Sequence, residues 1–293
     1  MVEKYFHIDP YCAQNLLSQV ETMKYSKNGI DRRAFLFDDY VVLSTNRLKL
    51  RNVTTRDDDF VYFNQIIETL WDLHNHGVSV LPILGYCYEP ESEDGVGYII
   101  QKRAIGSELY DDAVIARFQT WSKKDPLNLY LHSNMSDTEA VDYLVTRTHE
   151  ISQIPQEHFD KFISDMIHIL KKDLLIDCYG QSNFFYSHDI GFQFIDLDAH
   201  NDYKYGLTDQ QPNIEELVCI CAMTPCHYAV GTTLYSAVAL DEEALQKLTH
   251  CQYQTLARDN CIIFQKCMNA LQNNRILDKG IEKTLKQLNI FGY

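Results

Sequence analysis

Three carboxylates and one amide lie close together near the middle of the chain, around two short apolar runs. Asp177 ends the run LLID, Asp196 and Asp198 end the run GFQFIDLD, and Asn183 lies between the two runs. The second run predicts a buried strand that presents carboxylates at its C-terminal end. Carboxylate and amide oxygens are the ligands that Mg²⁺ prefers, so this segment is a candidate metal site.

The segment between the candidate ligands predicts a β-hairpin. Asn183 and Asp196 are 13 positions apart, and the sequence NFFYSHDIGFQFID fills the gap. Asp189 and Gly191 mark a turn between two extended runs. The preceding segment predicts a helix that begins near Pro155 and has a continuous apolar face, made by Phe159, Ile163, Met166, Ile167 and Leu170.

Residues 30 to 103 predict the order strand, strand, helix, strand, strand. Asp38 and Asp39 separate the first two apolar runs, which indicates a tight turn. The helix carries Phe60, Phe63, Ile67, Leu70 and His74 at spacings of three and four, and Gly77 is its expected C-cap. The second strand pair is expected in VSVLPILGYCYEP and GVGYIIQKR.

From about residue 107 the pattern becomes mainly helical, and DEEALQKLTHCQYQTLARDNCIIFQKCMNALQNN is its strongest helical piece. Residues 110–140 fit no simple pattern. We therefore expect an N-terminal part over 1–103, with a short cap at its start. A helical part over 104–293 would follow, with an insertion near 110–150.

The overall charge and the cysteines restrict the class of protein. The formal net charge is -15, which disfavours general binding to nucleic acid because phosphate backbones are repelled. No stretch predicts a signal peptide or a membrane span, so we expect a cytoplasmic chain with no membrane partner. The nine cysteines are then reduced thiols, mostly buried.

One cysteine cluster leaves two interpretations open. The sequence CICAMTPCH holds Cys219, Cys221, Cys226 and His227, which are residue types that bind metals. Their spacing is not that of a zinc finger, and no second pair follows nearby. Buried structural thiols are the alternative to a metal site.

The order of these elements resembles the protein-kinase-like superfamily, nearest in outline to aminoglycoside phosphotransferases and minimal bacterial kinases. GYIIQKRAIGSEL resembles the last strand of the small lobe and the linker, with Gly106 opening the second lobe. LLIDCYGQSNFFY resembles the catalytic loop, and FQFID resembles the metal-binding strand. The resemblance implies a bilobal α+β fold, with a small antiparallel-sheet N-lobe that contains one helix and a mainly helical C-lobe.

The resemblance also implies roles for three residues of the candidate metal site. Asp196 would be the principal Mg²⁺ ligand and Asn183 the second, while Asp177 would orient or deprotonate the acceptor hydroxyl. Two features depart from the family pattern. Six positions separate Asp177 from Asn183, where five are usual, and Leu175 replaces the usual His or Tyr.

For the nucleotide, the resemblance implies ATP as cofactor and a lysine held by a glutamate. Lys49, in RLKLRN, and Glu68, 19 positions later, are the candidates, and Gln101 at the end of the last N-lobe strand is a third nucleotide-binding candidate. A rival alignment puts Ser44 at the lysine position and makes Lys49 peripheral. No G-x-G-x-x-G loop and no A-P-E sequence occurs.

The resulting hypothesis is a phosphotransferase that moves the γ-phosphate of ATP, with Mg²⁺, to a hydroxyl of an unidentified small molecule or protein. An acidic surface would attract a cationic acceptor. A pseudokinase that binds a nucleotide or a partner without turnover is the alternative, because the glycine loop is missing and the catalytic loop is irregular. A metal-dependent hydrolase that uses Asp177, Asp196 and Asp198 is a third interpretation.

Overall fold

The computed structural model describes two compact units, residues 1–104 and residues 105–293. The described residues are 27–28, 32–46, 56–89, 96–111, 114, 135–172, 174–176, 183–195, 197–199, 215, 218–219, 222, 225 and 246–276. The fold is mixed α and β. Within the described residues, unit 1 contains an antiparallel sheet and one helix, and unit 2 contains three helices and two small antiparallel sheets.

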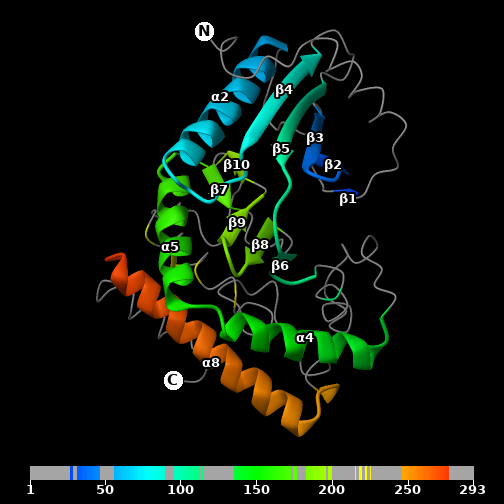
Figure 1. The fold of residues 1–293 in the computed structure, drawn as a ribbon, viewed down its shortest axis with the longest axis vertical. Helices are drawn as coiled ribbons and strands as arrows, with labels where there is room; N and C mark the ends of the chain where they lie inside the picture. The colour runs from blue at the N-terminus through cyan, green and yellow to red at the C-terminus, as the bar shows by residue number, and fades with distance from the viewer. Residues whose placement is uncertain are drawn as a thin grey trace, which may run out of the picture. The chain divides into compact units, whose positions relative to one another are not determined.

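The sheet of unit 1 has five strands in the order β1-β2-β3-β5-β4, and every neighbouring pair is antiparallel (Figure 1). Its strands are β1 (Lys27–Asn28), β2 (Arg32–Leu36), β3 (Tyr40–Asn46), β4 (Ile83–Glu89) and β5 (Val96–Lys102). The N–H of Phe37 donates to the carbonyl of Tyr40 at 2.9 Å, which closes a tight turn around Asp38 and Asp39. Both predicted strand pairs are therefore confirmed.

Helix α2 (Arg56–Asn75) lies beside the sheet and contacts β4 (Figure 1). Gly77 follows the end of the helix with a φ of 77°, the left-handed conformation that commonly terminates helices. The helix and its C-terminal glycine were predicted correctly. One member of the predicted apolar face is wrong, because His74 is exposed and Leu73 is buried in its place.

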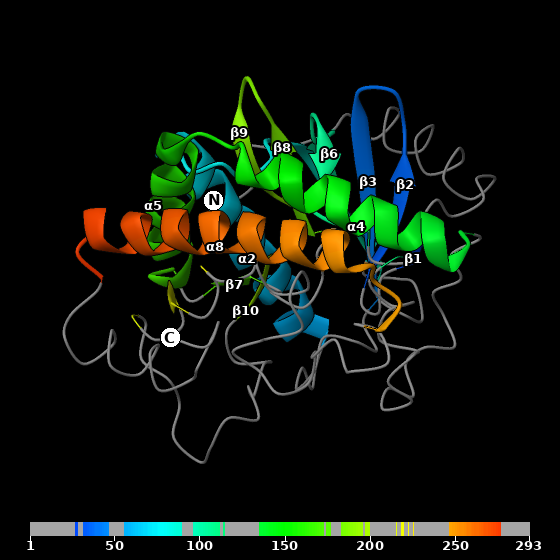
Figure 2. The ribbon, with the colours of Figure 1, turned by 90° about the horizontal axis from the view of Figure 1, so that it is seen from below.

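Unit 2 is built around three helices, α4 (Asp137–Ser152), α5 (Gln156–Leu170) and α8 (His250–Asn273). Helix α8 contacts both α4 and α5, and Figure 2 shows it beside α4 and crossing α5. The buried apolar residues of these helices include Leu144, Ile151, Phe159, Ile163, Leu256, Ile263 and Leu271. The helix expected near Pro155 is confirmed as α5, with Pro155 at its N-cap position.

Two helix boundaries differ from the sequence prediction, and side-chain caps explain both. The end of the stretch without a simple pattern begins helix α4, since Ser136 and Glu139 form a reciprocal capping box. The helical run expected from residue 241 is interrupted: Gln246 is helical, residues 247–249 are not, and α8 begins at His250, where Thr249 and Gln252 form a second capping box.

The remaining strands of unit 2 form two small sheets. Strands β6 (Ser107–Glu108), β8 (Phe184–Ser187) and β9 (Gly191–Phe194) make one sheet in the order β6-β8-β9. Strands β7 (Leu174–Ile176) and β10 (Leu197–Ala199) make the other. All of these pairs are antiparallel.

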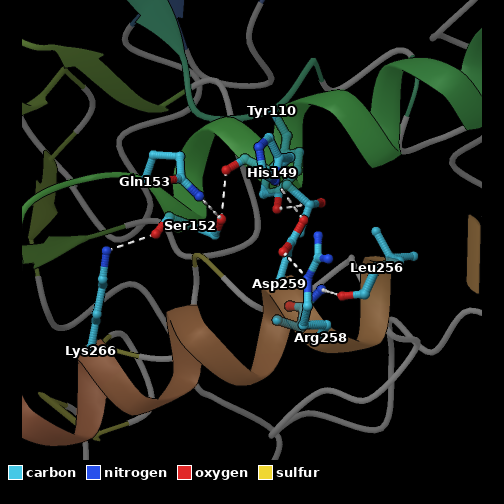
Figure 3. Close-up of polar contacts among 10 residues, drawn as sticks. Tyr110, His149, Ser152, Gln153, Leu256, Arg258, Asp259 and Lys266 are labelled. Atoms are coloured by element: carbon cyan, nitrogen blue, oxygen red, sulfur yellow. Dashed lines mark hydrogen bonds and ion pairs between the residues drawn. The ribbon is translucent and has the colours of Figure 1, made fainter. Parts of the chain in front are cut away.

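Polar side chains join α8 to the ends of α4 and α5 (Figure 3). The Lys266 ammonium donates to the carbonyl oxygens of Ser152 and Ile154 at 2.7 and 2.6 Å. Asp259, which is 1% exposed, lies 2.9 Å from Nδ1 of His149 and accepts a hydrogen bond from Nε of Arg258. These contacts fix α8 against the turn that connects α4 to α5.

The described cysteines agree only in part with the prediction. Cys219, Cys251, Cys261 and Cys267 are free thiols, but Cys251 and Cys261 are exposed. No group of three metal-binding side chains occurs in the described ranges, and Cys221, Cys226 and His227 lie outside them. Among the described helices, none has the length and apolar character needed to cross a membrane.

We predict that Lys266→Met lowers the free energy of unfolding by about 1–3 kcal/mol, because two helix-end carbonyls lose a charged donor. Lys247→Met is the control, since its ion pair with Asp137 is exposed and of little expected value. Urea denaturation of both variants measures the difference. Equal losses would contradict the prediction.

Lys266 also makes the free energy of unfolding depend on pH. Burial lowers the pKa of Lys266 below its ordinary value of 10.5. As the pH rises toward 10.5, the unfolded chain therefore binds more protons than the folded chain, and the free energy of unfolding increases. We expect this increase, measured by urea denaturation, to be smaller in Lys266→Met than in the native chain.

Candidate functional site

The hairpin β8–β9 places Asn183 beside the residue that precedes Asp196. Its strands pair from Phe184 opposite Phe194 to Ser187 opposite Gly191. At the open end of the hairpin, the N–H of Ile195 donates to the carbonyl of Asn183 at 3.1 Å. Asp196 follows Ile195 in the chain but lies outside the described residues.

The pair β7–β10 ends beside the two aspartates of the candidate site. Ile176 pairs with Leu197, Leu175 with Asp198 and Leu174 with Ala199. Asp177 is the next residue after Ile176, and Asp196 is the residue before Leu197, but both lie outside the described residues. Of Asp198, only the backbone is described.

A cluster of phenylalanines fixes the hairpin on helix α5. Phe162 of α5 lies with its ring centroid 5.8 Å from that of Phe184, 4.6 Å from that of Phe192 and 5.4 Å from that of Phe194. All four rings are at most 3% exposed. Because Phe184 and Phe194 are the residues next to Asn183 and Ile195, their packing also fixes the open end of the hairpin.

The closed end of the hairpin carries a different set of polar groups. Gly191 follows the turn with a φ of 88°, and the ring of His158 packs against it. His158 Nδ1 lies 2.9 Å from the hydroxyl of Tyr186, and its ring centroid is 6.4 Å from that of His188. Burial, and then the charge of Glu157, raise the pKa of Tyr186 above its ordinary value of 10.0.

Four residues of the hairpin strand span about 13 Å at roughly 3.3 Å per residue. The histidines at the closed end are therefore separate from Asn183 at the open end. The predicted turn at Asp189 and Gly191 is confirmed by the hydrogen bond from Ile190 N–H to the carbonyl of Ser187 at 3.3 Å.

The nucleotide-binding candidates belong to unit 1, whereas Asn183 belongs to unit 2. Gln101 is 5% exposed and pairs with Val41 on one side and Ile83 on the other. Glu68 is exposed on α2 and forms no ion pair with a cation of the described ranges. Lys49 lies outside the described residues, so its pairing with Glu68 stays a prediction.

The rival position for the lysine is described only in its backbone. Ser44 pairs with Arg33 of β2 and Tyr98 of β5, so it lies in a central strand of the sheet. These pairs do not decide between Ser44 and Lys49.

One buried polar side chain of the hairpin was missed by the sequence analysis. Gln193 of β9 is 6% exposed, and its amide hydrogen-bonds both the N–H and the carbonyl of Ile105, at 3.2 and 2.7 Å. The signal in the sequence is a glutamine between two phenylalanines of a buried strand, because a polar group so buried needs a partner.

Helix α4 carries an open hollow. It is lined by Glu139, Asp142, Tyr143, Thr146, Arg147 and Glu150.

Two solved structures resemble this chain. A structure of WaaP in complex with acyl carrier protein is 12% identical, with a TM-score of 0.39 over 96% of this chain and 92% of that chain. A co-crystal structure of WbdD and the kinase inhibitor LY294002 is 10% identical, with a TM-score of 0.27 over 60% of this chain and 33% of that chain. Scores this low establish no shared fold. No family model matches the chain, and no curated protein matches its sequence.

We predict that Phe162→Ala lowers the free energy of unfolding by about 3–5 kcal/mol, because it removes the ring that contacts three phenylalanines of the hairpin. Tyr253→Ala is the control, since that ring is 45% exposed on α8. Urea denaturation measures both values. A loss in Phe162→Ala no larger than in the control would show that the cluster does not hold the hairpin.

Proposed function

We propose that this chain is a kinase-like phosphotransferase, which moves the γ-phosphate of ATP to a hydroxyl acceptor with the help of Mg²⁺. One observation carries the proposal. The strand pair Ile176–Leu197 ends one residue before Asp177 and one residue after Asp196. The hydrogen bond between Ile195 and Asn183 lies one residue before Asp196.

The register of the two contacts supports a common site. Taking the β7–β10 register one residue further would pair Asp177 with Asp196, and directly opposite residues of antiparallel strands have Cα atoms about 4.5–5.5 Å apart. The hairpin would bring Asn183 to the same place, because Ile195 is bonded to it. Three oxygen-bearing side chains from three chain segments would then converge.

The donor set fits a hard divalent cation. Asn183 offers an amide oxygen and Asp196 a carboxylate, and Mg²⁺ takes oxygen ligands while keeping several waters. When bound, the metal neutralises charge on the phosphates. In this proposal Asn183 and Asp196 hold it, and Asp177 accepts the proton of the attacking hydroxyl or orients that hydroxyl.

Residues of unit 1 are proposed to bind the nucleotide. Lys49, paired with Glu68, would hold the α- and β-phosphates, and the exposure of Glu68 leaves its carboxylate accessible to a lysine. Gln101 would contribute only through its side chain, because its strand is paired on both sides. The element order of unit 1, three strands, one helix and two strands, supports this assignment.

The acceptor is proposed to be a cationic small molecule or a basic protein segment. The formal net charge of -15 favours a cationic partner and disfavours a nucleic acid.

A pseudokinase is the second candidate. Its support is the absence of any G-x-G-x-x-G sequence and the six-residue spacing between Asp177 and Asn183. Such a protein would bind a nucleotide or a protein partner without transferring phosphate.

We predict that ATP with Mg²⁺ raises the melting temperature of the native chain by several degrees, since a ligand at 100 times its dissociation constant adds about 2.7 kcal/mol. Asn183→Ala and Asp196→Ala should lose most of the Mg²⁺-dependent part of this shift. Asp189→Ala is the matched control, because Asp189 is exposed in the turn at the other end of the hairpin.

The same titration separates the two candidates. No shift at millimolar ATP, with or without Mg²⁺, would contradict nucleotide binding and thus the kinase proposal. A shift without hydrolysis and without any phosphorylated product would favour the pseudokinase.

A further inference from the structure

Helix α5 buries one carboxylate beside its apolar residues. Asp165 is 4% exposed. The ammonium of Lys161, one turn earlier on the same helix, donates to both carboxylate oxygens of Asp165 at 2.9 Å. The Lys161 side chain is 49% exposed, so this charged pair reaches from the interior of unit 2 to its surface. Because burial of a carboxylate costs free energy, its position on the helix needs an explanation.

The hairpin β8–β9 runs along α5. His158, in the first turn of the helix, lies at the closed end of the hairpin, where its ring packs against Gly191 and its Nδ1 lies 2.9 Å from the hydroxyl of Tyr186. Phe162, one turn later, stacks on the ring of Phe194, near the open end of the hairpin. The contacts therefore move from the closed end toward the open end as α5 runs toward its C-terminus.

Helical spacing puts Asp165 on the stripe of α5 that contacts the hairpin. Seven residues make almost two full turns, so Asp165 is in line with His158 and about 10.5 Å further along the helix axis. Asp165 also follows Phe162 by three positions, and residues three apart are neighbours on a helix surface. The stripe thus continues from His158 and Phe162 to the buried carboxylate.

Asn183 lies at the same level of the hairpin. It is three positions before Tyr186, which is about 10 Å along β8 toward the open end at roughly 3.3 Å per residue. Since His158 contacts Tyr186, nearly equal steps lead from this contact to Asp165 on the helix and to Asn183 on the strand. Asp165 is therefore level with the open end, where Ile195 is hydrogen-bonded to Asn183.

We infer that the Lys161–Asp165 pair sets the affinity of the open end of the hairpin for a divalent cation. The inference rests on the cation site of the proposed function. Asp165 adds a negative charge near that site in a region shielded from water, and Lys161 offsets part of this charge from the exposed side. Mg²⁺ keeps several of its waters, so a carboxylate can attract it without being a ligand.

The two members of the pair have opposite expected effects on cation binding. Asp165→Asn removes the negative charge and keeps an acceptor for Lys161, so it should weaken the binding of Mn²⁺ about three- to tenfold. Lys161→Gln keeps a donor for Asp165 and removes the positive charge, so it should strengthen the binding by a similar factor. Damage to packing would strengthen binding in neither variant.

A titration of the full chain with Mn²⁺ alone measures these affinities, through the broadening of the amide signals of Asn183 and Ile195. Asp160→Asn is the control for the carboxylate, because Asp160 lies on the same helix but accepts hydrogen bonds from Asn273 of α8. It should bind Mn²⁺ as the native chain does. Lys247→Gln is the control for the lysine and should also leave the affinity unchanged.

A measurement without metal tests the placement of Asp165 by itself. In the metal-free chain, Asp165→Asn should shift the amide signals of Asn183 and Ile195 more than that of Ile190, which lies in the turn at the closed end. Asp160→Asn should shift none of the three. A larger shift at Ile190 than at the open end would overturn the placement.

The outcomes separate this inference from the proposed function. Equal Mn²⁺ affinity in the native chain, Asp165→Asn and Lys161→Gln would overturn the inference and leave the cation site in place. Weaker binding in Lys161→Gln would overturn it too, and this variant decides the question if Asp165→Asn does not fold, since its own side chain is half exposed. No broadening at the open end of the native chain would contradict both the cation site and the inference.

Discussion

The candidate site depends on the packing of Phe162, a residue of helix α5, against the hairpin. Its ring packs against Phe184, Phe192 and Phe194, and each of these rings is almost fully buried. Burying one such side chain contributes roughly 1.5–3 kcal/mol. The cluster thus supplies the energy that holds a hairpin of only four residues per strand, which alone would be marginal in water. The position of Asn183 follows from it.

The helices of unit 2 keep this cluster in place. Helix α8 packs against α4 and α5, and Lys266 binds the carbonyl groups at the turn between them. Asp259, a buried residue of α8, accepts a hydrogen bond from Arg258 and lies 2.9 Å from Nδ1 of His149, so that its carboxylate is not left without partners in a dry interface. The helix–helix contacts therefore support α5, and α5 supports the hairpin.

Local patterns in the sequence predicted the elements whose signals are also local. The hairpin around Asp189 and Gly191, helix α5 and the end of α2 at Gly77 follow from alternation, spacing and turn residues. Helix α4 was missed although its capping box, Ser136 with Glu139, is visible in the sequence. The mixed polar composition before it concealed the helical spacing of Ala140, Leu144 and Ile151.

Local patterns could not predict contacts between residues that are far apart in the sequence. Gln193 and Ile105 are 88 positions apart, and only the fold shows that the glutamine is hydrogen-bonded to the backbone of Ile105. Likewise, the pairing of Ile176 with Leu197 depends on a register that composition does not specify. Local patterns also do not decide whether Lys49 or Ser44 occupies the nucleotide-binding position, since that depends on where one strand ends.

We propose that Asn183 and Asp196 hold one divalent cation at the open end of the hairpin, with Asp177 beside it. Paramagnetic broadening of amide signals by Mn²⁺, added together with a non-hydrolysable ATP analogue, tests it directly. We expect the strongest broadening at Asn183, Ile195 and Leu197, and little at Ile190 in the turn. Broadening centred on the acidic residues of α4, Glu139 and Asp142, or spread evenly over the chain, would contradict it.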